Sequence, residues 1–185
     1  MRKALILIIV GLPGSGKSTA AGIIKKKFDA DIVHSGDVVR EEVNKRGLKY
    51  TPKTDALVAH WFHTSGREKL MAKRVWDKVR ISKKRIIVIE GLRSPKVFYY
   101  LKKFSKTKPF IITVNASFEM RVERELKRGR FGKEETLNYL KTREKLEKSH
   151  GIKELMKKSD YRIDNTNLTV RQMESKIVKV VKSLI

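Results

Sequence analysis

An apolar run that ends in a glycine-rich turn constrains this chain more than any other feature. Residues 4–10 are all apolar, which is the pattern of a buried strand. The next nine residues have the spacing of a phosphate-binding loop: Gly11, Leu12, Pro13, Gly14, Ser15, Gly16, Lys17, Ser18 and Thr19. In such a loop backbone N–H groups surround the phosphates, the lysine reaches the β/γ oxygens, and the serine hydroxyl joins Mg²⁺. The sequence therefore predicts a site for a nucleoside triphosphate, with Lys17 as a catalytic cation and Ser18 as a metal ligand.

Strand-like apolar runs alternate with helix-length segments along the rest of the chain. The runs lie at 4–10, 31–34, 86–89, 110–114 and near 160–163. This alternation predicts an α/β fold, a three-layer sandwich in which helices cover both faces of a five-stranded, mainly parallel sheet. The chain length of 185 residues suits a single domain over 1–185, and 169–185 should form a final packing helix.

Polar residues follow three of these runs, and active sites in such sheets lie at the carboxyl ends of the strands. The glycine-rich loop follows the first run, Ser35-Gly36-Asp37 the second, and Glu90-Gly91-Leu92-Arg93 the third. Carboxylates close to a triphosphate are tolerated as ligands of Mg²⁺ waters or as partners of an arginine. We therefore predict Asp37 and Glu90 as metal-site residues; Asp37 is also suited to cap the following helix.

The chain is strongly basic, with 44 Lys and Arg residues against 20 Asp and Glu residues and a formal net charge of +24. Residues 65–108 contribute much of the excess, with fifteen basic and three acidic side chains. One interpretation is an RNA partner; the other is a lysine-rich surface of the kind found in hyperthermophile proteins.

Cysteine is absent, which excludes disulfides and thiolate metal sites. No run approaches the ~20 apolar residues of a membrane helix, so we expect a cytoplasmic protein with no membrane association.

The motifs together resemble those of the nucleoside monophosphate kinases. Adenylate kinases carry a Ser/Thr-Gly-Asp sequence, two hydrophobic residues and an arginine after the second strand, as at 35–40 here. The similarity is closer to an archaeal family of adenylate-kinase-related proteins, in which a strand ends in acid-Gly-hydrophobic-Arg-Ser, as at 90–94. The segment 159–165 also looks like one in dephospho-coenzyme A kinases. The resemblance extends over roughly residues 4–183.

The resemblance implies which side chains would bind an acceptor. Ser35, Gly36 and Asp37 would contact it, and Arg40 and Arg93 would clamp its phosphate. Arginine is suited to this task because its planar fork binds phosphate bidentately. The alternative for Arg40 is an exposed ion pair within its helix.

The resemblance further implies a lid at about 121–135 and an acceptor-binding insertion at about 49–80. Arginines 121, 124 and 128 share one helical face, and Gly129 and Gly132 flank Arg130 as hinges. We predict Arg124, Arg128 and Arg130 as catalytic residues, with Arg143 as a candidate from the returning helix. In the insertion, the spacing of Trp61, Phe62 and Trp76 favours core packing over base stacking. His60 and His63 are interpreted as packed or surface residues.

The activity that these features imply is transfer of the γ-phosphoryl group of ATP, with Mg²⁺, to a phosphorylated small acceptor such as AMP. Two alternatives remain open at the level of sequence. One is a kinase for dephospho-coenzyme A or another larger metabolite. The other is an RNA- or ribosome-associated NTPase in which the nucleotide state switches binding.

Overall fold

The computed structural model describes residues 4–64, 66–105, 107–129 and 131–185. Within these residues five strands form one sheet in the order β2-β3-β1-β4-β5, and every neighbouring pair is parallel. The strands are β1 (Leu5–Val10), β2 (Asp31–His34), β3 (Ile86–Glu90), β4 (Phe110–Asn115) and β5 (Tyr161–Asp164). The predicted α/β fold is confirmed, and the sheet is wholly rather than mainly parallel. The strand bounds agree with the apolar runs to within one residue.

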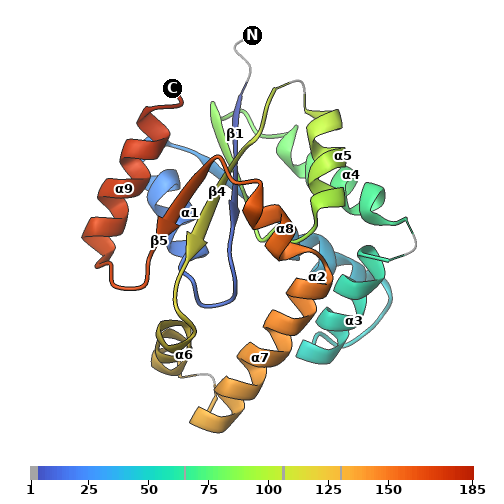
Figure 1. Cartoon of the computed structure of the whole chain (residues 1–185). Helices are drawn as coiled ribbons and strands as arrows, with labels where there is room; N and C mark the ends of the chain where they lie inside the picture. Colours follow the sequence, from blue (N-terminus) through green and yellow to red (C-terminus); the bar gives the residue numbers. More distant parts are fainter. Residues whose placement is uncertain (1–3, 65, 106, 130) are drawn as a thin grey trace.

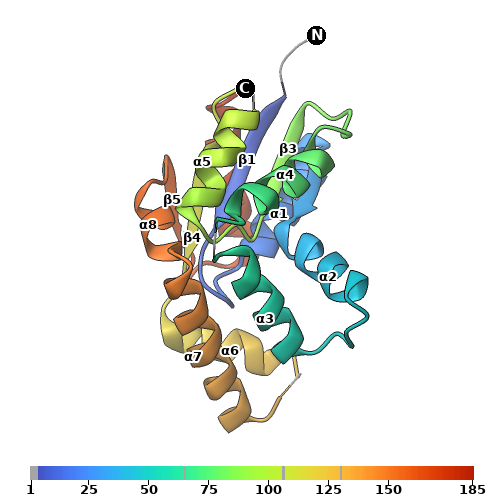
Figure 2. The ribbon, with the colours of Figure 1, turned by 90° about the vertical axis from the view of Figure 1, so that its right-hand side faces the viewer.

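The helices complete a three-layer arrangement (Figure 1). They are α1 (Lys17–Phe28), α2 (Ser35–Lys45), α3 (Pro52–Phe62), α4 (Glu68–Val79), α5 (Pro95–Phe104), α6 (Phe118–Lys127), α7 (Lys133–Ser149), α8 (Ile152–Lys157) and α9 (Val170–Lys182). Helices α1 and α9 cover one face of the sheet, whereas α4, α5 and α8 cover the other (Figures 1 and 2). Among the described residues, none of the helices combines the length and apolar character needed to cross a membrane.

Strand β1 lies at the centre of the sheet and divides its side chains between two cores. Ile6, Ile8 and Val10 pack into the core beneath α4 and α5, and Leu7 and Ile9 pack into the core beneath α1 and α9. A strand covered on both faces has to be apolar at every position, which explains the unbroken run in the sequence. The loop that follows β1 is thereby fixed to the central strand of the sheet.

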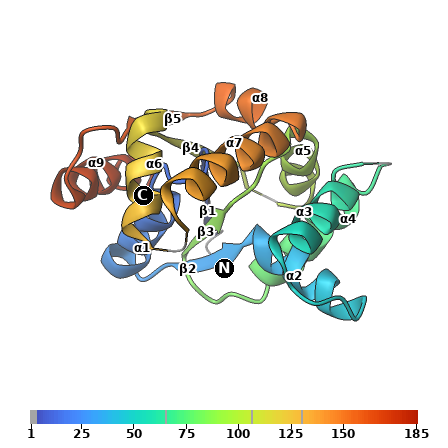
Figure 3. The ribbon, with the colours of Figure 1, turned by 90° about the horizontal axis from the view of Figure 1, so that it is seen from below.

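The carboxyl ends of the strands all point toward α6 and α7 (Figure 1). Seen from that end, α7 crosses the sheet edge, with α6 on one side and α3 on the other (Figure 3). These three helices have no strand between them and the edge. They enclose the space into which the loops after β1, β2 and β3 project.

Aromatic residues of segment 49–80 pack as predicted. Phe62 is fully buried in the core, and Trp61 and Trp76 are partly buried against it. The guanidinium groups of Arg46 and Arg67 lie 4.2 and 4.7 Å from the centre of a Trp61 ring. Cation–π contacts of this kind occupy the indole ring with side chains of the protein itself.

Three histidines form a cluster where α3 meets the end of α7. The rings of His63 and His150 are 4.3 Å apart between centroids, and those of His60 and His150 are 5.8 Å apart. Both ring nitrogens of His150 are buried without a hydrogen-bond partner among the described residues. Burial lowers the pKa of His63 to about 3 and that of His150 to about 4, and the positive charge of Arg93 acts in the same direction. His63 and His150 are therefore neutral near pH 7.

Stability should fall as the pH drops below the ordinary histidine pKa of ~6.5. Between that value and the lowered pKa values of His63 and His150, the unfolded chain binds more protons than the folded one, so protonation favours unfolding. We expect the free energy of unfolding, measured by urea denaturation, to be lower at pH 5.0 than at pH 7.5. The substitution His150→Phe should reduce this difference, whereas Lys26→Gln, at an exposed position on α1, should leave it unchanged. Equal pH dependence in wild type and His150→Phe would contradict the assignment.

Candidate functional site

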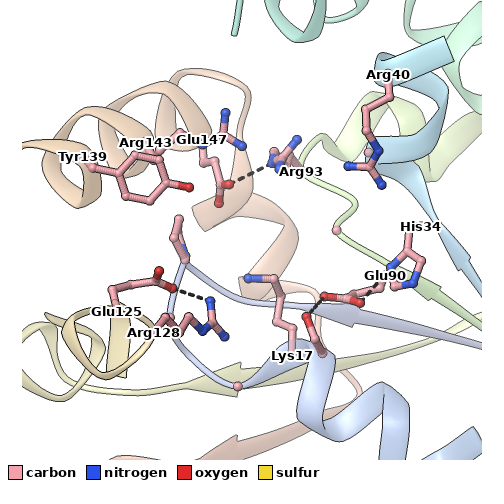
Figure 4. Close-up of a pocket in the computed structure, with 16 residues that line it drawn as sticks. Lys17, His34, Arg40, Glu90, Arg93, Glu125, Arg128, Tyr139, Arg143 and Glu147 are labelled. Atoms are coloured by element: carbon pink, nitrogen blue, oxygen red, sulfur yellow. Dashed lines mark hydrogen bonds and ion pairs between the residues drawn. The ribbon is translucent and has the colours of Figure 1, made fainter. Parts of the chain in front are cut away.

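A cavity of about 310 Å³ lies at the carboxyl ends of β1 and β3 (Figure 4). Its walls come from the loop after β1, from the ends of β2 and β3, and from α2, α6 and α7. Five cationic and three anionic side chains line it: Lys17, Arg40, Arg93, Arg128, Arg143, Glu90, Glu125 and Glu147. A surplus of positive charge in a polar cavity suits a polyanionic ligand.

Lys17 begins α1 and directs its amine into this cavity (Figure 4). The Nζ atom donates a hydrogen bond of 2.9 Å to the carbonyl oxygen of Leu12, across the loop. Burial lowers the pKa of Lys17 below that of an ordinary lysine, whereas the nearby Glu147 carboxylate acts in the opposite direction. A desolvated ammonium group held by its own loop is well placed to bind phosphate oxygens.

Close contacts hold the backbone of the glycine-rich loop. Gly16 has a φ of +102°, and a Cβ atom there would lie 2.4 Å from Nδ2 of Asn165. Asn165 donates from Nδ2 to the carbonyl oxygen of Ser15 at 2.8 Å, and Arg124 donates to the same oxygen at 3.3 Å. Glycine is therefore required at position 16 both by backbone conformation and by lack of space. These bonds tie the loop to the end of β5.

The oxygen atoms expected around Mg²⁺ lie together beside this loop. Ser18 Oγ donates to Glu90 Oε1 at 2.6 Å. The Glu90 Oε2 atom lies 3.0 Å from His34 Nδ1, without the geometry of a hydrogen bond, and it is buried with no hydrogen-bond partner among the described residues. A hydroxyl and an unsatisfied carboxylate oxygen are suitable ligands for Mg²⁺ or its waters. The residues present therefore fit the metal.

Each arginine of the cavity is paired with a carboxylate. Arg93 Nε donates to Glu147 at 2.9 Å, Arg143 to Asp55 at 2.8 Å, and Arg128 to Glu125 at 2.5 Å. Arg40 donates to Asp37, one helical turn before it. Such pairing makes it possible to bring several guanidinium groups close together, because each charge is partly compensated in place. In Figure 4, Arg40, Arg93 and Arg128 surround the space in front of Lys17.

The structure brings most of the predicted acceptor residues to this space. Gly36 and Arg40 line the cavity, and Ser35 is buried next to Gly91, where a Cβ atom would lie 3.1 Å from Ser35 Oγ. Neither Ser35 nor Asp37 is among the residues that line the cavity. Helix α2 begins at Ser35, so Asp37 lies within its first turn and not at the N-cap, and its side chain pairs with Arg40 outside the cavity lining. The N-cap interpretation is therefore wrong.

The arginines of the predicted lid differ in what they contact. Only Arg128 among those on α6 lines the cavity. Arg124 donates to the backbone carbonyl groups of Ser15 and Asn165, and Arg121 donates to Pro13 and Glu144. The helix is packed on its loop-facing side, so these two guanidinium groups contact the backbone of the phosphate-binding loop instead of open space. The predicted catalytic Arg130 lies outside the described residues.

Several residues of the site were missed by sequence reasoning. Glu147 is buried between Arg93 and Lys17, and it follows Tyr139 and Arg143 on α7 at intervals of four residues. That spacing on one helix was the available signal for a shared face. Asn165 ends the segment 159–165, and no signal in the sequence points to its contact with the glycine-rich loop.

Comparison with known proteins shows the family of this chain. Residues 10–141 match a family model described as an AAA domain. The chain is 34% identical to a UPF0200 protein of Pyrococcus horikoshii over 184 residues, covering 98% of both chains. It is 37% identical to a UPF0200 protein of Aeropyrum pernix over 163 residues, covering 88% of this chain and 84% of that protein.

Among solved structures, shikimate kinase from Acinetobacter baumannii has a similar fold. The two superpose with a TM-score of 0.59 at 16% sequence identity, covering 98% of this chain and 94% of the kinase. Such low identity establishes the fold alone. Taken with the sequence matches, it leads to one assignment: the chain belongs to the UPF0200 family of archaeal proteins, which here has a P-loop kinase-like fold.

Proposed function

We propose that this protein transfers the γ-phosphoryl group of ATP, with Mg²⁺, to a phosphorylated small acceptor, and that the acceptor is a nucleoside monophosphate such as AMP. The observation that carries the proposal is the convergence on one cavity of Lys17 and of arginines from α2, the β3–α5 loop, α6 and α7. Several cations on one cavity suit a reaction that brings two polyanions into line, in which catalysis rests on positioning and charge stabilisation.

The donor half of the site is the loop after β1. Its backbone N–H groups and the Lys17 ammonium would bind the β- and γ-phosphates. Ser18 and Glu90 would hold Mg²⁺, which neutralises phosphate charge when bound. Because Lys17 is already fixed by Leu12, little reorganisation is needed when negative charge moves toward the leaving oxygen.

The acceptor half lies across the cavity from that loop. Arg40 and Arg93 would grip the acceptor's phosphate and hold its oxygen in line with the γ-phosphorus, and Arg128 would reach the transferred group from α6. No covalent enzyme intermediate is required, because positioning and charge stabilisation account for most catalysis of this reaction.

We assign the enclosing segments as an acceptor-binding insertion at about 49–80 and a lid at about 121–135. Closure of these segments over the cavity would exclude water, which otherwise competes with the acceptor for the phosphoryl group.

The proposal does not extend to RNA. Within the described residues, eight basic side chains of segment 65–108 lie in ion pairs with carboxylates: Lys73, Arg74, Lys78, Arg80, Lys84, Arg93, Lys96 and Lys108.

The direct experiment is a screen of phosphorylated acceptors with Mg·ATP, in which ADP release is measured. Rapid ADP formation that depends on a nucleoside monophosphate supports the proposal. ADP formation with dephospho-coenzyme A alone would reassign the acceptor, and hydrolysis that no small acceptor stimulates would reject the kinase.

The substitution Lys17→Ala should lower phosphoryl transfer by at least ~10²-fold, the loss expected when one electrostatic stabiliser is removed from a preorganised site. The matched control is Lys26→Ala, an exposed lysine on the same helix, which should retain full activity. Turnover rates from coupled ADP assays provide the measurement, and circular dichroism checks that both variants fold. Wild-type turnover in folded Lys17→Ala would reject the role of the loop.

The substitution Arg40→Ala should raise the acceptor KM or lower kcat by roughly 10- to 10³-fold, because a charged hydrogen bond to phosphate is lost. The KM for ATP should change little. Arg80→Ala is a matched control, since Arg80 is also exposed and also pairs with an aspartate three residues earlier. If Arg40→Ala raised the KM for ATP and left the KM for the acceptor unchanged, Arg40 would belong to the donor half of the site.

The substitution Glu90→Gln should raise the Mg²⁺ concentration needed for half-maximal activity by about 10-fold or more, as is usual when a carboxylate beside a metal is neutralised. The amide keeps the shape of the side chain and can still accept from Ser18. Glu174→Gln on the surface of α9 serves as the control. An unchanged Mg²⁺ dependence in Glu90→Gln would remove Glu90 from the metal site.

A further inference from the structure

A second cavity, of about 190 Å³, adjoins the first. It lies between the N-terminal end of α3 and the helix α7, and two of its lining residues, Tyr139 and Arg143, also line the first cavity. The remaining lining residues are Tyr50, Pro52, Asp55 and Phe131. A ligand that fills the first cavity can therefore extend into the second without leaving the protein surface.

Three of the six residues that line this second cavity are aromatic. Tyr50 is 49% exposed and Phe131 is 37% exposed, although large aromatic side chains usually bury most of their area. The Phe131 and Tyr139 rings lie 5.4 Å apart between centroids, at an angle of 40°. Tyrosine and phenylalanine faces that border an open slot provide stacking surfaces for a planar ring.

A single carboxylate, that of Asp55, lies among these rings. Asp55 is 9% exposed; its Oδ2 atom accepts from Arg143 at 2.8 Å, and its Oδ1 atom accepts from the Tyr50 hydroxyl at 3.3 Å. An ionised carboxylate offers about four lone-pair positions, so about two remain here. Only a hydrogen-bond donor can use them. The slot therefore combines stacking surfaces with an acceptor for N–H groups.

Arg143 links the two cavities. Its guanidinium contacts Asp55 through Nη1, while its Nε atom is buried without a hydrogen-bond partner among the described residues. Arg93 and Glu147 line the first cavity. Glu147 lies one helical turn after Arg143 on α7. A ligand with a ring in the second cavity would thus have its phosphate beside arginines in the first.

Resting on the function proposed above, we propose that the second cavity binds the ring of the acceptor, and that Asp55 selects a heteroaromatic base bearing an amino group. The acceptor class is then a nucleoside monophosphate whose base donates hydrogen bonds, with Tyr50 stacking on the ring. A phosphorylated sugar without a base would leave the slot unfilled. A base with no N–H donor on its edge would leave the remaining acceptor positions of Asp55 unused.

The ring site can be tested by calorimetric titration of AMP and of ribose 5-phosphate, which has the same sugar phosphate without the base. We expect AMP to bind at least 10-fold more tightly. Tyr50→Ala should weaken AMP binding by about 5- to 100-fold, the range for loss of one stacking partner, and should leave ribose 5-phosphate unchanged. Tyr99→Ala, an exposed tyrosine on α5, is the control for both ligands. Equal affinities for the two ligands, or no effect of Tyr50→Ala, would overturn the ring site.

The role of Asp55 needs a second pair of ligands: AMP and purine riboside 5′-monophosphate, which has the same ring system without the amino group. Wild type should prefer AMP by about 10-fold, and Asp55→Asn should abolish the preference. Because both ligands carry the same phosphate, any effect of Asp55→Asn on Arg143 cancels in the ratio. The substitution Tyr50→Phe removes only the hydroxyl that donates to Asp55 Oδ1. It should therefore reduce the preference for AMP less than Asp55→Asn does. A preference that survives in Asp55→Asn would overturn the assignment of Asp55.

Binding and turnover separate this inference from the proposed function. If AMP binds through Tyr50 and Asp55 as described but no ADP forms, the ring site stands and the kinase proposal fails. If ribose 5-phosphate is phosphorylated as fast as AMP, the kinase stands and the ring site fails. If titration detects neither ligand, the ring site is rejected whatever the turnover.

Discussion

The compensation of positive charge around Lys17 is the interaction on which the rest of the site depends. Four guanidinium groups and a buried ammonium line one cavity, an arrangement that would repel itself without partners. The partners come from different elements: Glu147 on α7 balances Arg93 after β3, and Asp55 on α3 balances Arg143 on α7. The same ion pairs that allow the charges to gather therefore also fix α3 and α7 relative to the sheet.

The fold could be predicted because its signals are local. The strands are short apolar runs, and the loop after β1 has a spacing that few other structures require. The partners of the site residues could not be predicted in the same way. Glu147 lies 54 residues from Arg93, Asp55 lies 88 residues from Arg143, and Asn165 lies 150 residues from Ser15. Pairings over such distances are set by the topology of the sheet, which periodicity does not encode.

The arginines of α6 show where helical spacing stops being informative. Residues 121, 124 and 128 share a face, as their spacing predicts, yet only Arg128 reaches the cavity. The other two meet carbonyl groups of the glycine-rich loop, since the loop and the end of β5 pack against that helix. Spacing identifies which side chains point together. The groups that they contact depend on which other segments pack against the helix, here the glycine-rich loop and the end of β5.

The regular spacing of Tyr139, Arg143 and Glu147 on α7 has a consequence for how this protein family can diversify. The three side chains follow one another at intervals of one helical turn, so their positions along the cavity are fixed relative to one another. A change in the length of the connection between α6 and α7 would shift or rotate all three side chains together. Under the proposed function, such a change would alter the length of acceptor that fits the cavity while leaving the glycine-rich loop unchanged.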